Sequence, residues 1–424
     1  MNEYDSAKIS DILAASHDFT TTDNLNKADF IVLNTCSIRA KAEEKIFSEL
    51  GRLRPLKKKN PNLILAVGGC VAVQEQKNIF RRAPCVDIVF GPQTLHRLPE
   101  MYEKTLRKEK RVIDTTPAPI EKFDYFPTPR ITGPAAYVSI MEGCNKFCSY
   151  CIVPFTRGRE ISRPIQDILT EIKNLTDKGA KEIHLLGQNV NAYCDPNKQG
   201  SFADLIYATA KNDTVKRIRF TTSHPAEFGD DLVTMFAIEP KLVNHLHLPI
   251  QSGSNRILKL MRRGYTQEEY REIIAKIRKV RPDIGISTDF IVGFPGETEE
   301  DFTLTMEIVR NLNFDASFSF IYSPRPNTTA AKLEDTVSLD EKKRRLAVLQ
   351  NQLATQTRQY NKAMIGTVQK ILACGRSKKD PTHFTGRTEN NRIVNFTAPR
   401  DILGEIVGVK ITEALTNSLR GAVV

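Results

Sequence analysis

Short apolar runs alternate with amphipathic segments along the first hundred residues of the chain. Continuous apolar stretches at residues 30–33 and 63–67 are typical of buried parallel strands, and residues 87–90 form a third, weaker one. Between the first two, apolar residues recur at helical spacing over residues 46–53. This alternation predicts an open α/β sheet.

The same alternation resumes at residue 136 and continues to residue 322. Amphipathic helices such as 166–176 and 268–280 separate six apolar segments that we expect to be strands. The expected strands are residues 136–141, 182–186, 217–221, 245–249, 286–292 and 317–322. Repeated strand–helix units favour a full or a partial parallel barrel, and the periodicity leaves both possibilities open.

The other parts of the chain have different patterns. Residues 106–134 are rich in charge and then in proline, which is typical of a linker. Residues 338–364 have the pattern of one long helix that begins with a Ser-Leu-Asp-Glu capping sequence. Short β-like runs with glycine turns at 367–373, 393–396 and 405–411 predict a small all-β module.

Together these patterns predict a mixed α/β chain in four parts. They are an open α/β sheet domain at 1–112, a linker at 113–129, a central barrel-like domain at 130–360 and a small all-β barrel at 361–424.

The charge of the chain favours a polyanionic partner. The net charge is +11, and from residue 361 onward ten Lys and Arg stand against five Asp and Glu. Nucleic acid is the usual polyanionic partner, although a merely soluble basic protein would have the same composition. We see no apolar run near the roughly 18 residues that a membrane span needs and no signal peptide, so we expect a cytoplasmic protein with no membrane partner.

The sharpest chemical signal is the CxxxCxxC run formed by Cys144, Cys148 and Cys151. A structural zinc site needs four ligands, and this loop has no fourth cysteine or histidine nearby. Three thiolates on a four-iron cluster leave one iron open, which can bind S-adenosylmethionine (SAM) and generate a 5′-deoxyadenosyl radical. The run follows the first expected barrel strand, so the cysteines should lie at the carboxyl end of the barrel.

Six other residues are weaker candidates for binding. Gln188 and Asn189 end an expected strand, where they could contact SAM or substrate, or could simply be polar turn residues. In the C-terminal module two phenylalanines lie among arginines, which fits base stacking with phosphate contact, and a core position for each ring is equally compatible. The four residues of this module are Phe384, Arg387, Arg392 and Phe396.

The residues around the cysteine run resemble those of a known family. Residues 141–164 resemble the radical-SAM loop of the methylthiotransferases. Asn-Thr-Cys-Ser-Ile-Arg at 34–39 and Gly-Gly-Cys at 68–70 resemble the N-terminal cluster motifs of this family. Residues 187–193 and 248–253 are similar to later signatures of the family, and the C-terminal module is similar to the RNA-binding TRAM domain.

This resemblance spans essentially the whole chain and is strongest to the branch that acts on N6-dimethylallyladenosine next to the tRNA anticodon. It implies a radical-SAM [4Fe-4S] cluster on Cys144, Cys148 and Cys151, and an auxiliary [4Fe-4S] cluster with Cys36 and Cys70 among its ligands. One SAM would donate the methyl group and a second would supply the radical that abstracts hydrogen from C2, where sulfur is added. The implied partners are the tRNA anticodon stem-loop and an electron donor such as flavodoxin or ferredoxin, with the enzyme a monomer.

The chain departs from the family in its auxiliary-cluster ligands. The family uses three cysteines there, the first in a Gly-Cys-Gln segment just before residues like 1–6 of this chain, so we expect the natural start to lie upstream. Cys85 is a poor substitute because it precedes an expected strand, whereas Cys36 and Cys70 follow theirs. Sister branches act on threonylcarbamoyl-adenosine in tRNA or on an aspartate of a ribosomal protein, and an inactive tRNA-binding homologue is a further alternative.

Overall fold

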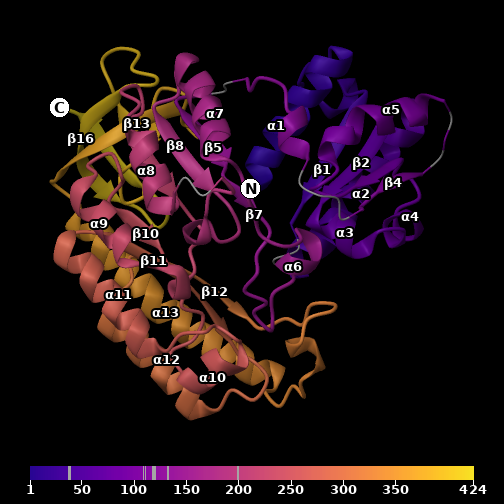
Figure 1. Ribbon diagram of the computed structural model, residues 1–424. Coiled ribbons are helices and arrows are strands. Elements are labelled where there is room, and N and C mark those ends of the chain that lie inside the picture. Colours follow the sequence, from indigo (N-terminus) through magenta and orange to yellow (C-terminus); the bar gives the residue numbers. More distant parts are fainter. Residues whose placement is uncertain (37–39, 108, 110, 117–120, 131–132, 198–199) are drawn as a thin grey trace. The chain divides into compact units, whose positions relative to one another are not determined.

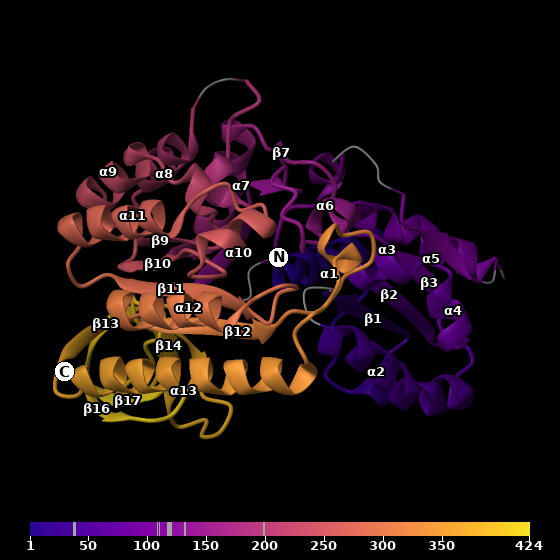
Figure 2. The ribbon, with the colours of Figure 1, turned by 90° about the horizontal axis from the view of Figure 1, so that it is seen from below.

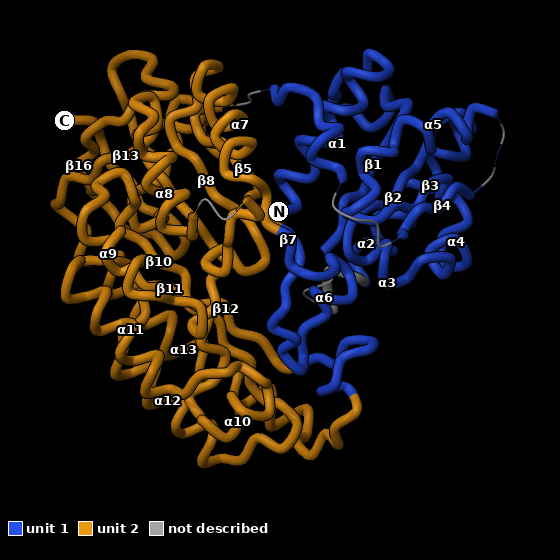
Figure 3. The backbone as a smooth tube through the Cα atoms, in the orientation of Figure 1, with its two compact units in different colours: residues 1–130, 142–161, 323–331 blue, residues 131–141, 162–322, 332–424 orange. Residues whose placement is uncertain are grey.

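The computed structural model describes most of the chain, which forms two compact units (Figure 3). The described residues are 1–36, 40–107, 109, 111–116, 121–130, 133–197 and 200–424. Unit 1 comprises Met1–Arg130, Glu142–Ile161 and Ser323–Ala331, and unit 2 comprises Ile131–Met141, Ser162–Tyr322 and Lys332–Val424.

Unit 1 is built on a four-stranded parallel sheet in the order β1-β2-β3-β4 (Figure 1). The strands are β1 (Phe30–Thr35), β2 (Ile64–Gly69), β3 (Ile88–Phe90) and β4 (Val112–Asp114). The apolar runs predicted the first three strands. β4 lies within the stretch that its charge and proline content indicated as a linker, and its three residues are only half buried.

Helices cover both faces of this sheet because side chains alternate along each strand. Ile88 and Phe90 of β3 pack with α1 and α5, while Val89 between them packs with α2, α3 and α4. The helices of unit 1 are α1 (Asn2–His17), α2 (Ala40–Lys59), α3 (Cys70–Glu75), α4 (Asn78–Arg82), α5 (Leu98–Leu106) and α6 (Val153–Thr156). Short 3-10 turns are η1 (Leu25–Lys27), η2 (Leu95–Arg97) and η3 (Lys122–Tyr125).

Unit 2 contains six parallel strands in two sheets that form an open, partial barrel. The first sheet has the order β5-β8-β9 and the second has the order β10-β11-β12. A parallel bridge joins Ile218 of β9 to Leu242, just before β10. The strands are β5 (Ala135–Ser139), β8 (Glu182–Leu186), β9 (Arg217–Phe220), β10 (His245–His247), β11 (Gly285–Val292) and β12 (Ala316–Ile321). Each overlaps an expected strand, which confirms the partial barrel.

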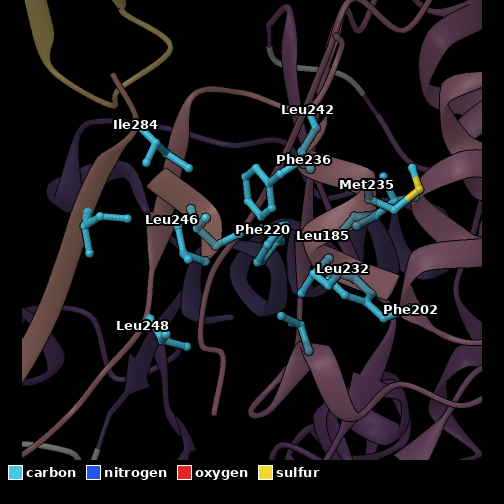
Figure 4. Close-up of a cluster of buried hydrophobic side chains, with 14 of the residues drawn as sticks. Leu185, Phe202, Phe220, Leu232, Met235, Phe236, Leu242, Leu246, Leu248 and Ile284 are labelled. Atoms are coloured by element: carbon cyan, nitrogen blue, oxygen red, sulfur yellow. The ribbon is translucent and has the colours of Figure 1, made fainter. Parts of the chain in front are cut away.

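Amphipathic helices surround these strands and bury one continuous apolar core. Figure 4 shows this core around Phe220 and Phe236, whose ring centroids lie 6.0 Å apart. The helices are α7 (Ile165–Asp177), α8 (Phe202–Ala210), α9 (Asp230–Ile238), α10 (Asn255–Leu260), α11 (Gln267–Val280), α12 (Glu299–Leu312) and α13 (Leu339–Ala363). The remaining short elements are β6 (Met141–Glu142), β7 (Ile161–Ser162), η4 (Val190–Ala192), η5 (Pro225–Glu227) and η6 (Ala330–Lys332).

Long helix α13 leads into a closed five-stranded barrel of the order β13-β14-β15-β17-β16 (Figure 2). The strands are β13 (Val368–Arg376), β14 (Phe384–Arg387), β15 (Ile393–Thr397), β16 (Ile406–Ala414) and β17 (Leu419–Val423). Ser338 caps α13 as expected, because its hydroxyl accepts a hydrogen bond from the Glu341 N–H at 3.2 Å. The all-β module predicted from the sequence is therefore confirmed.

Two arginines with little exposed surface fasten the C-terminal barrel to the strands of unit 2. Arg392 forms a two-pronged pair with Asp315, with N–O distances of 2.5 and 2.8 Å, and also donates to the side chain of Asn361 at 2.6 Å. Arg219 of β9 donates to the backbone carbonyls of Thr388 and Glu389 at 3.2 and 3.0 Å. The barrel is thus held by charged groups that lose their partners if it separates.

We expect Arg392→Met to lower the free energy of unfolding of unit 2 by about 3 kcal/mol, because it leaves the buried Asp315 carboxylate without its partner. Urea unfolding followed by circular dichroism would measure the loss. Arg400→Met is the matched control, since Arg400 pairs with Glu405 on the surface and should leave the transition unchanged. Equal midpoints for the two variants would contradict the assignment.

Candidate functional site

The cysteine run lies on a loop of residues 142–161, called here the cysteine loop, whose ends pair as β6 and β7. Gly143 has a φ of +77°, and a Cβ built there would lie 1.9 Å from the carbonyl oxygen of Arg159. No other residue fits that close approach without moving the backbone. The glycine before the first cysteine therefore allows the loop to fold back on itself.

Backbone hydrogen bonds then fix the three cysteines within this loop. The Cys144 N–H donates to the Gly158 carbonyl at 3.3 Å, and the Cys151 N–H donates to the Cys148 carbonyl at 2.9 Å. Cys148 is buried, while Cys144 and Cys151 are half-buried. Burial raises the pKa of the Cys144 thiol, and the neighbouring Cys148 adds to this effect.

The donor set of the loop fits a four-iron cluster, which takes thiolate ligands and leaves one iron open when only three are supplied. Within the described ranges, no three His, Cys, Asp or Glu side chains are already arranged around a common metal position. The assignment of Cys144, Cys148 and Cys151 to a cluster thus rests on their spacing and chemistry, and it stays a prediction.

A second cysteine pair lies at the carboxyl edge of the unit 1 sheet. Thr35 of β1 pairs with Gly69 of β2, so Cys36 and Cys70 are the next residues along two neighbouring parallel strands. Such strands run about 4.8 Å apart, which brings the two cysteines within reach of one cluster. The motif residues that follow Cys36, at 37–39, lie outside the described part of the chain.

The threonine before Cys36 holds this edge together. Its hydroxyl donates to the Gly68 carbonyl at 2.6 Å and accepts a hydrogen bond from the Val71 N–H at 3.2 Å. Gly69 has a φ of +92°, and a Cβ there would lie 2.4 Å from the Thr35 carbonyl oxygen. The Gly-Gly-Cys sequence therefore permits a close turn from β2 into α3, which begins at Cys70.

Cys85 lies away from this edge. It precedes β3, at the amino end of the sheet, and burial raises the pKa of its thiol. This position agrees with the expectation that Cys85 is a poor third ligand.

Four charged side chains form a buried network in unit 1 that the sequence did not indicate. Asp5, Lys122, Glu142 and Arg157 are each at most 4% exposed. Arg157 donates to Asp5 at 2.7 Å and to Glu142 at 3.4 Å, and Glu142 also accepts from Lys122. Gln93 completes the network, because its amide nitrogen donates to Glu142 at 2.9 Å and to the Arg157 carbonyl at 2.8 Å.

The electrostatics of this network favour its charged state. Burial acts to lower the pKa of Arg157, but Asp5, Cys70 and Glu142 outweigh it and hold the pKa well above its ordinary value. Burial likewise acts to raise the pKa of Asp5, yet Arg157 and Lys122 hold it below its ordinary value. Arg157, from the cysteine loop, therefore also carries its charge near Cys70 of the second cysteine pair.

The loops after β8 and β9 in unit 2 contain buried polar groups. Asn189 is 1% exposed, and neither atom of its amide has a hydrogen-bond partner among the described residues. Side-chain and backbone bonds of 2.8 Å between Asn191 and His224 join the two loops. A buried amide without partners is costly unless a ligand or water satisfies it. A ligand contact by Asn189 would satisfy this amide and stays a prediction, and its neighbour Gln188 is half-buried.

The four residues predicted to bind RNA differ in how far their side chains are exposed to solvent. Phe384 and Phe396 are 1% and 0% exposed and face each other inside the C-terminal barrel, with ring centroids 6.0 Å apart. The prediction that they stack on bases is therefore wrong, and their core position is confirmed. Arg392 is engaged with Asp315, which leaves Arg387 as the exposed member of the set.

Comparison with known proteins identifies the family. The Radical SAM superfamily model matches residues 138–309, the TRAM domain model matches 362–424, and the uncharacterized family UPF0004 matches 1–91. The tRNA-2-methylthio-N(6)-dimethylallyladenosine synthases of Mannheimia succiniciproducens and Histophilus somni are each 56% identical over 427 residues, covering 100% of this chain and 90% of theirs. The chain belongs to this family of radical-SAM enzymes.

Solved structures support the fold alone. The radical SAM methyltransferase TsrM from Kitasatospora setae matches with a TM-score of 0.57 at 14% identity, over 76% of this chain and 72% of that one. The cobalamin-dependent SAM radical enzyme OxsB matches with a TM-score of 0.55 at 14% identity, over 81% of this chain and 53% of that one.

Membership of the tRNA-2-methylthio-N(6)-dimethylallyladenosine synthase family confirms the resemblance seen in the sequence. It implies a [4Fe-4S] cluster and SAM as cofactors and tRNA as substrate. The division of the chain at residues 112, 129 and 360 stays a prediction. Among the described residues, no helix is long and apolar enough to cross a membrane.

We expect Arg157→Met to lower the free energy of unfolding of unit 1 by about 3–5 kcal/mol, because Asp5 and Glu142 would remain buried next to Lys122 alone. Thermal and urea unfolding of the full chain would measure this loss. Arg159→Met, two residues along the same loop and exposed, is the matched control and should cost little. A small loss in both variants would mean that the network does not support the loop.

We expect the stability of unit 1 to fall with acidification through the titration of Asp5. Because the pKa of Asp5 is lowered on folding, its contribution is complete above the unfolded value of about 3.9 and is lost as the pH falls through the lower folded value. Asp5→Asn should flatten the fall in melting temperature between about pH 5 and about pH 2. The exposed Asp23→Asn should keep the wild-type slope, and a wild-type slope in Asp5→Asn would exclude this carboxylate as the cause.

Proposed function

We propose that this protein converts N6-dimethylallyladenosine, next to the anticodon of tRNA, to its 2-methylthio derivative. The observation that carries the proposal is the 56% identity to tRNA-2-methylthio-N(6)-dimethylallyladenosine synthases over the whole chain and 90% of their length. Identity of this extent includes the cysteine loop, the second cysteine pair and the C-terminal barrel together. It therefore supports the complete reaction rather than radical chemistry in general.

In this proposal Cys144, Cys148 and Cys151 hold the radical-SAM cluster. When bound there, such a cluster would leave one iron open to hold SAM and would supply the electron for radical formation from SAM. The residues of the chain bind and position the reactants. The turn at Gly143 and the network around Arg157 fix the loop, and the unpartnered amide of Asn189, with Gln188 beside it, is a candidate contact to SAM or substrate.

Cys36 and Cys70 are proposed as ligands of an auxiliary [4Fe-4S] cluster that supplies the sulfur. Their support is the strand register that makes them neighbours and the positive charge of Arg157 near Cys70. Of the three cysteines that the resemblance implies for this cluster, Cys36 and Cys70 are the two that match the N-terminal motifs of this chain.

The proposed partners follow from the substrate. The C-terminal barrel, with the exposed Arg387, would contact the phosphates of the anticodon stem-loop. A small electron donor such as flavodoxin or ferredoxin would reduce the radical-SAM cluster, and a monomer in the cytoplasm, where tRNA is available, is consistent with this role.

The number of clusters can be measured directly as iron and acid-labile sulfide per chain after anaerobic reconstitution. We expect about eight irons in the wild type and about four in the Cys144→Ala/Cys148→Ala/Cys151→Ala variant, as two four-iron clusters require. About four irons falling to none would mean that only the radical-SAM cluster forms. Zinc in place of iron would contradict the radical-SAM assignment.

The substrate can be tested with the same reconstituted protein, SAM, a reductant and anticodon stem-loop RNAs. We expect a methylthio product, detected by mass spectrometry, from the RNA carrying dimethylallyladenosine. A product only from threonylcarbamoyl-adenosine RNA, or only from a ribosomal protein, would assign the chain to a sister branch. SAM cleavage without product would indicate an incomplete auxiliary cluster, and RNA binding without SAM cleavage an inactive homologue.

A further inference from the structure

A cavity of about 300 Å³ lies within unit 1 beside the cysteine loop. Its wall is made by residues from α3, from the turns after β3 and β4, from the loop around α6 and from Pro326 and Asn327. Cys151 immediately precedes the wall residue Ile152, and Cys70 opens the helix that contributes Val73. Each proposed cluster site is thus within three residues of the cavity wall.

The wall of this cavity suits a neutral, partly apolar ligand. Val73, Ile152, Pro154 and Phe155 form an apolar part together with two further prolines, and threonine and amide side chains, two glycines and Arg157 form the rest. Within the described residues, Arg157 is the single charged side chain of the wall, and its guanidinium is already paired inside the network described above. A phosphate would therefore find no available positive charge here, whereas a purine base carrying an alkyl group would fit the wall.

Phe155 has the exposure expected of a stacking side chain. It is 49% exposed although it is a large apolar residue, while the backbone of α6 around it is fixed. The Phe155 N–H donates to the Ile152 carbonyl at 3.0 Å, and the Arg157 N–H donates to the Val153 carbonyl at 2.8 Å. Proteins that bind unpaired bases commonly stack them on exposed aromatic rings.

The size of the cavity indicates a single base. Ligand pockets usually measure about 300–1,000 Å³, so this one is at the lower limit of that range, which suits a small ligand such as a base. The dimethylallyl group adds five carbons to adenine, and the apolar part of the wall offers these carbons a place out of water. The adenine of SAM has no such group and would gain nothing from that wall.

We propose that this cavity binds the target base itself, with Phe155 stacked on the purine and the dimethylallyl group against Val73 and Ile152. This inference rests on the proposed function and adds to it a site of substrate selection. It explains how the enzyme would distinguish alkylated from unmodified adenine before any chemistry takes place.

The chain contains no tryptophan, so the fluorescence of a single introduced tryptophan can be followed without background from other indoles. In Phe155→Trp, stacking on the base should quench the single indole emission. Titration with an anticodon stem-loop carrying dimethylallyladenosine should give quenching at a concentration at least about tenfold lower than the same RNA with adenosine. Tyr207→Trp is the control, since Tyr207 is 50% exposed on α8 and does not contribute to the cavity, and its emission should not change.

Binding measurements complete the test. Phe155→Ala should bind both RNAs about tenfold more weakly, because its ring stacks on the purine that they share, whereas Tyr207→Ala should match the wild type. Equal quenching by both RNAs, quenching by SAM alone, or wild-type affinity for both RNAs in Phe155→Ala would each overturn the inference. The proposed function is judged separately, because the wild type would still form methylthio product from the dimethylallyl RNA if only the cavity assignment were mistaken.

Discussion

The organisation of unit 1 depends on one buried interaction, the pairing of Arg157 with Asp5 and Glu142. Arg157 and Glu142 both belong to the cysteine loop, Glu142 as its first residue, and Asp5 belongs to α1, so this single guanidinium ties the start of the loop and α1 to the later part of the loop. Burying two carboxylates is unfavourable unless their cations are also present. Lys122 supplies the second positive charge, and the network as a whole is electrically balanced.

The balance of charge requires a buried lysine from a segment that the sequence places on the surface. Lys122 comes from the region whose proline and charge content indicated a linker, yet its side chain is completely buried and also donates to the Pro92 carbonyl at 3.0 Å. Lysine is almost never fully buried without a partner, so sequence reasoning places such a residue on the surface. No local pattern could reveal the partner, because Glu142 lies twenty residues further along the chain.

The helices and strands that the sequence predicted differ from those that it missed in whether their apolar residues recur at a regular spacing. Most of the long strands and helices carry their own periodicity and were found, whereas helix α1 (Asn2–His17), whose apolar residues do not follow a helical repeat, was not. Strands β14 and β17 were not predicted, and each contains a glycine at a point of close strand packing. A Cβ at Gly386 of β14 would lie 2.2 Å from the Leu372 carbonyl oxygen, and one at Gly421 of β17 would lie 2.5 Å from the Lys410 carbonyl oxygen. These glycines allow close strand packing but remove apolar signal from strands of four and five residues. The cysteine motifs could be recognised from the sequence because their residues lie close together along the chain. The burial of Phe384 and Phe396 could not, because it follows from the strand register that pairs these two residues.

The composition of unit 1 has a consequence for how this protein can be divided or inherited. Its three segments, Met1–Arg130, Glu142–Ile161 and Ser323–Ala331, are separated in the chain by parts of unit 2. A gene fragment that encodes only the first segment would lack the cysteine loop, and one that begins after it would leave that loop without Asp5 and Lys122. Recombination at the apparent domain boundary, near residue 130, would thus divide unit 1 between two fragments, although every segment of unit 2 would stay in the C-terminal fragment.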